Sequence, residues 1–359
     1  MQANQGRRTF LTLDGLRAVG AFLVVMRHVP FLFGPIAVPE SFLAVDLFYL
    51  VSGFVVAHAY RERLEAGGFF LTFVKTRLIR LYPFYFCGMV LGVLAALASI
   101  ITDPEGWWTP AKLIFSIATG LFMVPFLPGM PSNGSSLDGP TWTLLPELIA
   151  NFVYALLVRF LNTWTLLAII GVFGAGMVLI ELKFGTLDVG FAATDLWAAL
   201  VRVGFSFFTG VLLFRLSGHR QQHVEWMSWA LVLLLTVLLA WRPDESMKPL
   251  FELAVVLFGF PLLLVLAANF EPGAGAGKVF SFLGLLSYGI YIVHQPLGNL
   301  ARFALGRDAD IPEDYTGLIY GAVFLVILTV VAWRIDRDID APARKILRRI
   351  FLQEGNSSR

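Results

Sequence analysis

One apolar segment near the N-terminus, from Leu13 to Val29, is long enough to cross a membrane yet carries Asp14, Arg17, Arg27 and His28. Ionisable groups are costly in hydrocarbon, so a helix that keeps several usually turns them toward a protein interior or a water-filled path. At about 100° per residue, Arg17 and His28 lie ~20° apart around the helix and ~16 Å apart along it. Asp14 falls within ~40° of the same line, whereas Arg27 points elsewhere. The segment therefore predicts a helix with one polar face.

The rest of the chain is strongly apolar as well. Of its 359 residues, 57% are hydrophobic and 14% are charged, and the mean hydropathy is +0.75. This composition predicts an all-α polytopic membrane bundle, with residues 1–359 forming a single domain. Ten runs have spanning length, namely 11–33, 40–60, 81–102, 142–160, 164–182, 191–215, 224–241, 250–268, 279–303 and 316–334. A further run at 111–127 is short and contains Pro125, so we expect a re-entrant or interfacial segment.

The placement of basic residues predicts the orientation of the chain. Arg7 and Arg8 precede the first run, and the last run is followed by Arg344, Lys345, Arg348 and Arg349. By the positive-inside rule, the tails 1–10 and 335–359 are expected in the cytoplasm. The net charge of +2 reflects this topology and gives no support to nucleic-acid binding. Cys87 is the single cysteine and the histidines are scattered, so neither a disulfide framework nor a metal site is expected.

Polar residues recur at helical spacing in four later segments. They are Asp46, Ser52 and Gly53; then Arg77 and Arg80; then Glu147, Asn151 and Tyr154; and finally Ser287, Tyr291 and His294, with Tyr288 and Gln295 alongside. Arg77 and Arg80 are one turn apart and can face the same anion, although topology alone also explains basic residues beside a membrane. Pro83, just after them, predicts the entry into the third span. Glu147 requires a partner, because an unpaired buried carboxylate is too costly to keep.

His28 is the candidate general base. A neutral imidazole takes a proton from a hydroxyl near neutral pH and returns it to a leaving group. The alternative is a packing histidine that bonds a neighbouring carbonyl. Glu147, Asp46 or Asp14 could orient the ring, and the sequence does not choose among them. His58 and His294 are expected mainly to pack and to hydrogen-bond, with His294 the better functional candidate.

Five segments, in order along nearly the whole chain, resemble the acyltransferase-3 family of integral membrane acyltransferases. They are LDGLRAVGAFLVVMRH, VDLFYLVSGF, RLIRLYPFY, TWTLLPELIANFVY and LGLLSYGIYIVHQP. The resemblance implies transfer of an acyl group, usually acetyl from acetyl-CoA, to a hydroxyl, most often on a cell-surface carbohydrate. Some relatives carry an additional esterase-like domain, for which this chain has no room.

The resemblance also implies roles for single residues. The family's arginine, ten residues, histidine pattern matches Arg17 and His28, with the histidine as catalytic base. Its Arg-x-x-Arg pattern matches Arg77 and Arg80, which implies contact with the donor. Its tryptophan, serine, leucine, two residues, glutamate pattern falls on Trp142, Thr143, Leu144 and Glu147, with threonine in place of serine.

Together these features predict an acetyl-CoA-dependent O-acetyltransferase without a tightly bound cofactor. The donor would bind from the cytoplasm near Arg17, Arg77 and Arg80. His28 would then deprotonate an acceptor hydroxyl or relay the acyl group through a short-lived covalent step. Candidates for acceptor binding are Trp142, Tyr288 and His294, and Trp107 and Trp108 could stack on sugar rings. The acceptor stays open among exopolysaccharide, O-antigen, peptidoglycan and a small glycosylated metabolite, and membrane lipid and polysaccharide-biosynthesis proteins are the expected partners.

The alternative from another class is a proton-coupled transporter of a polar or anionic solute. In it, Asp14, Arg17, His28 and Glu147 would form the substrate path. The lack of a convincing internal repeat and the order of the family segments count against this alternative.

Overall fold

The computed structural model describes residues 9–124, 137–217, 221–306 and 315–352, and most of these are helical. The first part of the chain forms α1 (Leu11–His28), α2 (Ala44–Ala66), α3 (Phe70–Thr102), α4 (Pro110–Gly120), α5 (Leu144–Leu157) and α6 (Thr163–Phe184). The second part forms α7 (Leu196–Leu216), α8 (Glu225–Ala240), α9 (Lys248–Ala254), α10 (Phe260–Asn269), α11 (Ala274–Leu305), α12 (Leu318–Ile335) and α13 (Ala341–Leu352). Short turns extend several of them, namely η1 (Pro30–Leu32), η2 (Pro39–Leu43), η3 (Gly139–Thr143), η4 (Val158–Phe160), η5 (Val255–Gly259), η6 (Tyr315–Gly317) and η7 (Asp336–Asp340). Two short parallel strands, β1 (Gln222–His223) and β2 (Phe270–Glu271), pair ahead of α8 and α11.

Within the described residues, 8 helical segments are long and apolar enough to cross a membrane. They are Pro39–Ala66, Phe70–Thr102, Gly139–Phe160, Thr163–Phe184, Leu196–Leu216, Lys248–Asn269, Ala274–Leu305 and Leu318–Leu352. The other two predicted spans correspond to α1, which is interrupted by charge, and to α8, which is apolar but has only 16 residues. The predicted all-α polytopic membrane fold is therefore confirmed.

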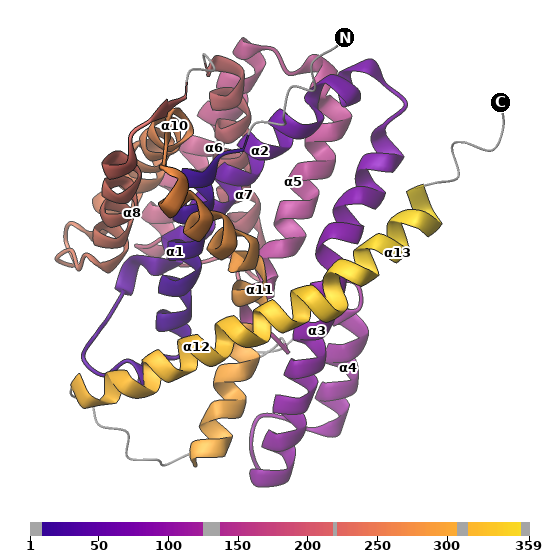
Figure 1. Cartoon of the computed structure of the whole chain (residues 1–359), viewed down its shortest axis with the longest axis vertical. Coiled ribbons are helices and arrows are strands. Elements are labelled where there is room, and N and C mark those ends of the chain that lie inside the picture. The colour runs from indigo at the N-terminus through magenta and orange to yellow at the C-terminus, as the bar shows by residue number, and fades with distance from the viewer. Residues whose placement is uncertain (1–8, 125–136, 218–220, 307–314, 353–359) are drawn as a thin grey trace.

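The run predicted not to cross the membrane contains α4, which has 11 residues. At 1.5 Å per residue such a helix is about 16 Å long, roughly half of a hydrocarbon core. Helix α4 packs beside the far end of α3 (Figure 1). Pro125 and the rest of that run, like Arg7 and Arg8, lie outside the described residues.

Two helices are longer than their apolar runs indicate. Helix α3 begins at Phe70, so Pro83 lies inside the helix, and the prediction that it marks the start of the third span is wrong. Proline is tolerated inside membrane helices because neighbouring groups satisfy the freed backbone carbonyl. The segment after the last apolar run continues α12 through the π-helical turn Asp336–Asp340 into α13, and this long helix crosses the bundle obliquely against α3 (Figure 1).

Helices α2 and α7 pack almost backbone to backbone. A Cβ atom at Gly53 would overlap the carbonyl oxygen of Phe207, and one at Gly210 would overlap that of Leu50. Small residues at such a crossing allow the close approach that holds membrane helices together. Gly53, which the sequence analysis grouped with Asp46, is thus explained by packing.

Helices α1 and α11 run side by side through the centre of the bundle. Gly277, Gly284 and Gly298 of α11 lie against Leu11, Asp14 and Val29 of α1, respectively. The glycines share a seven-residue spacing, and Tyr291 occupies the remaining position of that series. This parallel arrangement brings the end of α1, with His28, beside the middle of α11.

Candidate functional site

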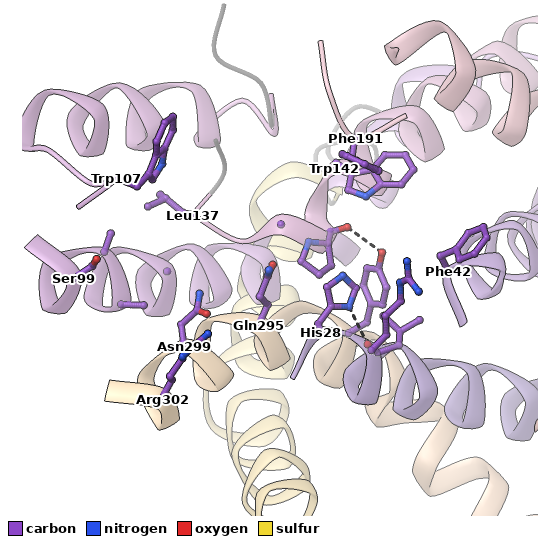
Figure 2. Close-up of a pocket in the computed structure, with 18 of the residues that line it drawn as sticks. His28, Phe42, Ser99, Trp107, Leu137, Trp142, Phe191, Gln295, Asn299 and Arg302 are labelled. Atoms are coloured by element: carbon purple, nitrogen blue, oxygen red, sulfur yellow. Dashed lines mark hydrogen bonds between the residues drawn. The ribbon is translucent and has the colours of Figure 1, made fainter. Parts of the chain in front are cut away.

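Two cavities inside the bundle contain most of the candidate residues. The histidine cavity, of about 800 Å³, is lined by His28 and by aromatic residues that include Trp107, Trp108 and Trp142 (Figure 2). The arginine cavity, of about 420 Å³, is lined by Arg17, Arg77, Arg80, Arg344, Asp14 and Glu147. Val45 and Tyr291 line both cavities, so the two spaces are separated by little more than one layer of side chains.

His28 is held at the C-terminal end of α1 by a backbone contact. Its Nδ1 lies 2.9 Å from the carbonyl oxygen of Val24. A carbonyl only accepts, so Nδ1 carries the proton and Nε2 keeps its lone pair. The residue is exposed to the cavity. His28 therefore has the tautomer and the access that a general base requires.

A second imidazole lies directly against His28. The ring of His294 on α11 packs edge-on to it with centroids 5.0 Å apart. The Nδ1 of His294 donates to the carbonyl oxygen of Tyr291 at 2.8 Å, and its Nε2 has no hydrogen-bond partner among the described residues. His294 is completely buried. It is therefore placed to hold the ring of His28, while His28 alone of the two is accessible.

Glu147 lies in the arginine cavity. Its Oε1 accepts from Ser52 Oγ at 2.6 Å and from Arg77 Nη2 at 3.1 Å. Arg77 is buried and Glu147 is partly exposed. Arg77 is therefore the partner that a buried carboxylate at Glu147 is expected to need.

The remaining charges of the arginine cavity come from α1, α3, η7 and α13. Arg17 lies 3.6 Å from Asp14, and Arg344 contacts Asp336 at 3.0 Å and Asp340 at 2.8 Å. Arg80 is exposed and makes no ion pair within the described residues. Four carboxylates line the same cavity, namely Asp14, Glu147, Asp336 and Asp340, and they pair with three of its four guanidinium groups. Arg80 is the remaining one, and a guanidinium without a carboxylate partner can bind an anion such as a phosphate.

Tyr291 is the centre of the wall that divides the cavities. Its hydroxyl donates to the carbonyl oxygen of Pro140 at 2.9 Å and lies 3.1 Å from Thr143 Oγ1. Phe48 packs edge-on against Tyr291. The ring of Phe48 also fills the space next to Gly20 of α1. We call Val45, Phe48 and Tyr291 the dividing wall. The wall interrupts the polar face of α1 between Arg17 and His28.

The turn that carries Pro140 and Thr143 starts at Asp138. The Asp138 carboxyl is buried and has no hydrogen-bond partner among the described residues. Burial raises the pKa of Asp138 well above its usual range.

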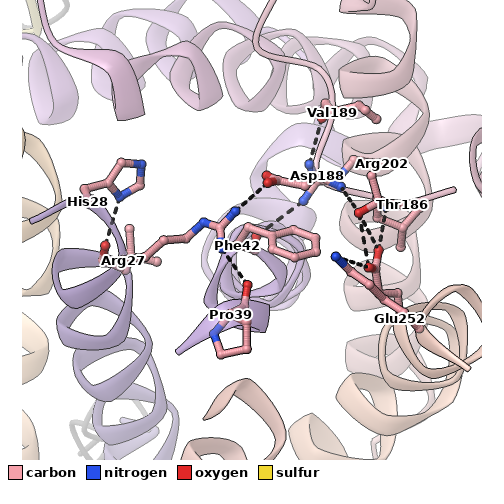
Figure 3. A network of polar contacts seen from close by, with 12 residues as sticks. Arg27, His28, Pro39, Phe42, Thr186, Asp188, Val189, Arg202 and Glu252 are labelled. Carbon is pink, nitrogen blue, oxygen red and sulfur yellow. Dashed lines mark hydrogen bonds and ion pairs between the residues drawn. The ribbon is translucent and has the colours of Figure 1, made fainter. Parts of the chain in front are cut away.

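Two ion pairs brace the histidine cavity. Arg27 extends away from His28 and bonds Asp188 at 2.5 Å and the carbonyl oxygen of Pro39 at 2.6 Å (Figure 3). Arg202 pairs with Asp46 at 2.6 Å, and both side chains are buried. Arg202 also donates to the carbonyl oxygen of Val189 at 2.8 Å (Figure 3). These contacts tie α1 and α2 to the segment before α7.

The structure separates several residues that the sequence analysis grouped. Asp14 and Arg17 line the arginine cavity, whereas His28 lines the histidine cavity. Asp14, Asp46 and Glu147 all have arginine partners, so the expectation that one of them orients His28 is not met, and the carbonyl of Val24 takes that place.

The three predicted acceptor-binding residues also lie apart. Trp142 lines the histidine cavity, and His294 is buried beside His28. Tyr288 lines the arginine cavity, where its hydroxyl donates to the carbonyl oxygen of Leu81 at 2.8 Å. Tyr288 therefore belongs to the other cavity.

Two groups of cavity residues were not predicted from the sequence. The first is Asp336, Asp340 and Arg344, which topology alone would explain as a basic helix end. The second is Asn299 and Arg302, which follow Gln295 on α11 at helical spacing and line the histidine cavity. Extending the polar stripe by two further turns would have found the second group.

Comparison with known proteins agrees with this architecture. The model of an acyltransferase family, described as an acyltransferase domain, matches residues 10–335. A protein of Rhizobium radiobacter, described as protein 2 in the picA locus, is 41% identical over 160 residues, which are 41% of this chain and 81% of that protein. No solved structure matches the chain. The chain belongs to the acyltransferase-3 family and is a multi-pass membrane acyltransferase.

Proposed function

We propose that this protein is an O-acetyltransferase that moves an acetyl group from acetyl-CoA to a hydroxyl of a cell-surface carbohydrate. One observation carries the proposal. A histidine with a free Nε2 and a cluster of arginines line two cavities that meet at a single wall. An acyl donor rich in phosphate and an acceptor rich in hydroxyls suit these two cavities, respectively.

The charges of the arginine cavity support binding of the donor there. The phosphates of acetyl-CoA would bind Arg80, with Arg17 and Arg344 close by, while the thin pantetheine arm points toward Tyr291. Arg80 makes no ion pair in the described part of the chain, so it offers a charge that a phosphate can take without breaking an existing contact. The basic face of α13 continues from Arg344 through Lys345, Arg348 and Arg349, which supports attraction of the same anion.

The chemistry needs one base and one passage through the dividing wall. Nε2 of His28 takes the proton of the acceptor hydroxyl, and the oxygen attacks the thioester carbonyl carbon. The carbon–sulfur bond then breaks, and the proton on the imidazole passes to the leaving thiolate sulfur to give CoA and an O-acetyl ester. A general base of this kind contributes about 10² to 10⁴ in rate. The thioester reaches His28 only when Tyr291 moves aside.

The positive-inside rule orients this arrangement. Basic residues gather at the α13 end of the arginine cavity, so we propose that it opens to the cytoplasm of a bacterial inner membrane and the histidine cavity to the opposite side. Both chain ends would then be cytoplasmic. A cytoplasmic donor thereby meets an external acceptor without either crossing the whole membrane.

The proposal is tested with the full-length protein in lipid vesicles supplied with radiolabelled acetyl-CoA. Glycan from a deletion strain serves as the acceptor. We expect wild-type protein to label the glycan, and His28→Gln to reduce the rate by roughly 10²-fold or more with acetyl-CoA binding unchanged. His223→Gln, an exposed histidine outside both cavities, is the matched control.

Two results would contradict the proposal. Normal transfer by a correctly inserted His28→Gln protein would remove the histidine from catalysis. A wild-type protein that never consumes acetyl-CoA, together with unchanged glycan acetylation in the deletion strain, would remove the acetyltransferase function and would favour the transporter alternative.

A further inference from the structure

We infer that the acceptor is an anionic glycan, whose carboxylate or phosphate binds Arg302 while the reacting hydroxyl lies at His28. This inference rests on the proposed function and specifies the class of acceptor. It comes from the charges of the histidine cavity.

The charges that line the histidine cavity do not balance. Arg27, Arg202 and Arg302 are its basic residues, and Asp188 is its acidic one. Asp188 forms an ion pair with Arg27, and the buried carboxylate of Asp46 neutralises the charge of Arg202. Arg302 makes no ion pair within the described residues. Among the described residues, Arg302 is therefore the lining charge without a counter-charge, and it can bind an anionic ligand.

Arg302 is an exposed residue whose guanidinium contacts an aromatic ring. Its guanidinium lies over the ring of Phe31, 5.6 Å from the centroid. A stacked guanidinium keeps its five N–H donors at the edge of the plane, where a carboxylate or phosphate can bind bidentately. Topology does not account for this residue, because basic residues near membrane spans favour the cytoplasmic side and Arg302 lies at the opposite end of α11 from Arg80's cavity.

A polar stripe on α11 connects Arg302 to the catalytic histidine. Gln295, Asn299 and Arg302 follow one another away from His28 along the cavity wall (Figure 2). Seven residues of helix separate Gln295 from Arg302, which is about 10 Å along the axis. The anionic group would thus lie one or two sugar units from the acetylated hydroxyl.

The first member of the stripe also lacks a partner. The Oε1 atom of Gln295 is buried and accepts no hydrogen bond from the described residues. Buried polar groups are normally satisfied, so this oxygen requires a donor such as a sugar hydroxyl or a water. Trp142 and Trp107 line the same cavity and can stack on sugar faces. The cavity thus offers apolar contact, a hydrogen-bond acceptor and a cation in the arrangement that an acidic sugar chain needs.

The first test is chemical analysis of the glycan whose acetylation differs between a deletion strain and its parent. We expect a carboxylate or phosphate on the acetylated sugar or on a neighbouring one. Carboxyl groups are reduced in one sample of the glycan, and phosphates are removed in a parallel sample. The treatment that removes the negative charge of the glycan identifies the group that carries it. An acetylated glycan without any acidic group would overturn this inference and leave the acetyltransferase proposal intact.

The second test uses the vesicle assay with this glycan as acceptor. We expect Arg302→Gln to raise the KM for the glycan by roughly 10- to 100-fold, because a hydrogen-bonded charge is lost. The KM for acetyl-CoA should not change, and Arg302→Lys should recover part of the loss. The wild-type KM for the neutralised glycan should match that of Arg302→Gln.

The control is Arg242→Gln, which removes an exposed arginine that does not line either cavity. An unchanged glycan KM in Arg302→Gln would overturn the inference. A wild-type protein with no transfer at all would instead overturn the proposed function, and this inference with it.

Discussion

The two cavities hold their arginines in different ways. In the histidine cavity, Arg202 and its partner Asp46 are 1% and 0% exposed, so the pair is sealed within the bundle. In the arginine cavity, Arg77 and its partner Glu147 are 4% and 20% exposed, so the carboxylate faces the open space. The two arginine–carboxylate pairs therefore differ in what can reach them.

This difference separates structural charge from functional charge. A sealed ion pair has no solvent and no ligand to replace either partner, so its loss is felt by the whole fold. A pair at a cavity surface can exchange partners with water or with an incoming anion at lower cost. We therefore expect Asp46 and Arg202 to hold α2 against α7, and Glu147 and Arg77 to be open to a ligand in the arginine cavity.

The largest expected effect is on stability and comes from the sealed pair. Asp46→Ala leaves Arg202 buried without a counter-charge, which costs about 3–5 kcal/mol. Thermal unfolding of the purified protein in detergent measures this loss. Glu147→Ala, the matched change in the open pair, should cost less.

The pair itself need not be kept for the fold to form. Replacing both partners together, as Asp46→Leu with Arg202→Met, should recover most of the melting temperature, because well-packed apolar residues often substitute for a buried ion pair. Equal melting temperatures for Asp46→Ala and Glu147→Ala would break the distinction between the two cavities.

The next effect concerns donor binding in the arginine cavity. Arg80→Ala removes the arginine that has no ion-pair partner among the described residues. A charge-assisted hydrogen bond to phosphate is worth about 1.5–3 kcal/mol, so we expect the KM for acetyl-CoA to rise by roughly 10- to 100-fold. Steady-state kinetics at varied acetyl-CoA measures this change.

Arg80→Ala should leave the glycan KM unchanged, in contrast to Arg302→Gln. Arg63→Ala is the control, since Arg63 is exposed on α2 and does not line the arginine cavity. If Arg80→Ala affected the glycan and not acetyl-CoA, the assignment of donor and acceptor to the two cavities would have to be reversed.

Features of the fold and of the site could be predicted from the sequence where they depend on a single segment of the chain. Apolar run length and the order of five motifs predicted the bundle and the family, because both are properties of single segments. Helix geometry also predicted the shared face of Asp14, Arg17 and His28. It could not predict that Phe48 and Tyr291, from other helices, pack across that face and divide it.

Other misses have the same cause. The sequence around Asp46 suggests a site residue, whereas in the structure Asp46 pairs with Arg202, which is 156 positions away. The position of Arg344 in the sequence suggests a topological charge, whereas in the structure the helix continues through the π-helical turn Asp336–Asp340 and Arg344 lines the arginine cavity. Both depend on long-range packing, which spacing within one segment does not contain.

The smallest expected effect bears on the dividing wall itself. Tyr291→Phe keeps the ring but removes the hydroxyl that donates to Pro140 and lies next to Thr143. Losing such a hydrogen bond costs about 0.5–1.5 kcal/mol, so the wall should open several-fold more often. An open wall admits water from the histidine cavity to the thioester. We therefore expect acetyl-CoA hydrolysis without acceptor to rise several-fold, measured as release of free thiol.

Tyr288→Phe is the control for this change, because it also removes a tyrosine hydroxyl bonded to a backbone carbonyl of the bundle, at 2.8 Å, but not at the wall. If the two variants hydrolyse acetyl-CoA equally, general loosening of the bundle explains the leak. If only Tyr291→Phe leaks, the hydroxyl of Tyr291 keeps the donor from water until the acceptor is bound. The threonine at position 143 then has a role as well, since its Oγ1 lies within hydrogen-bond distance of the same tyrosine hydroxyl.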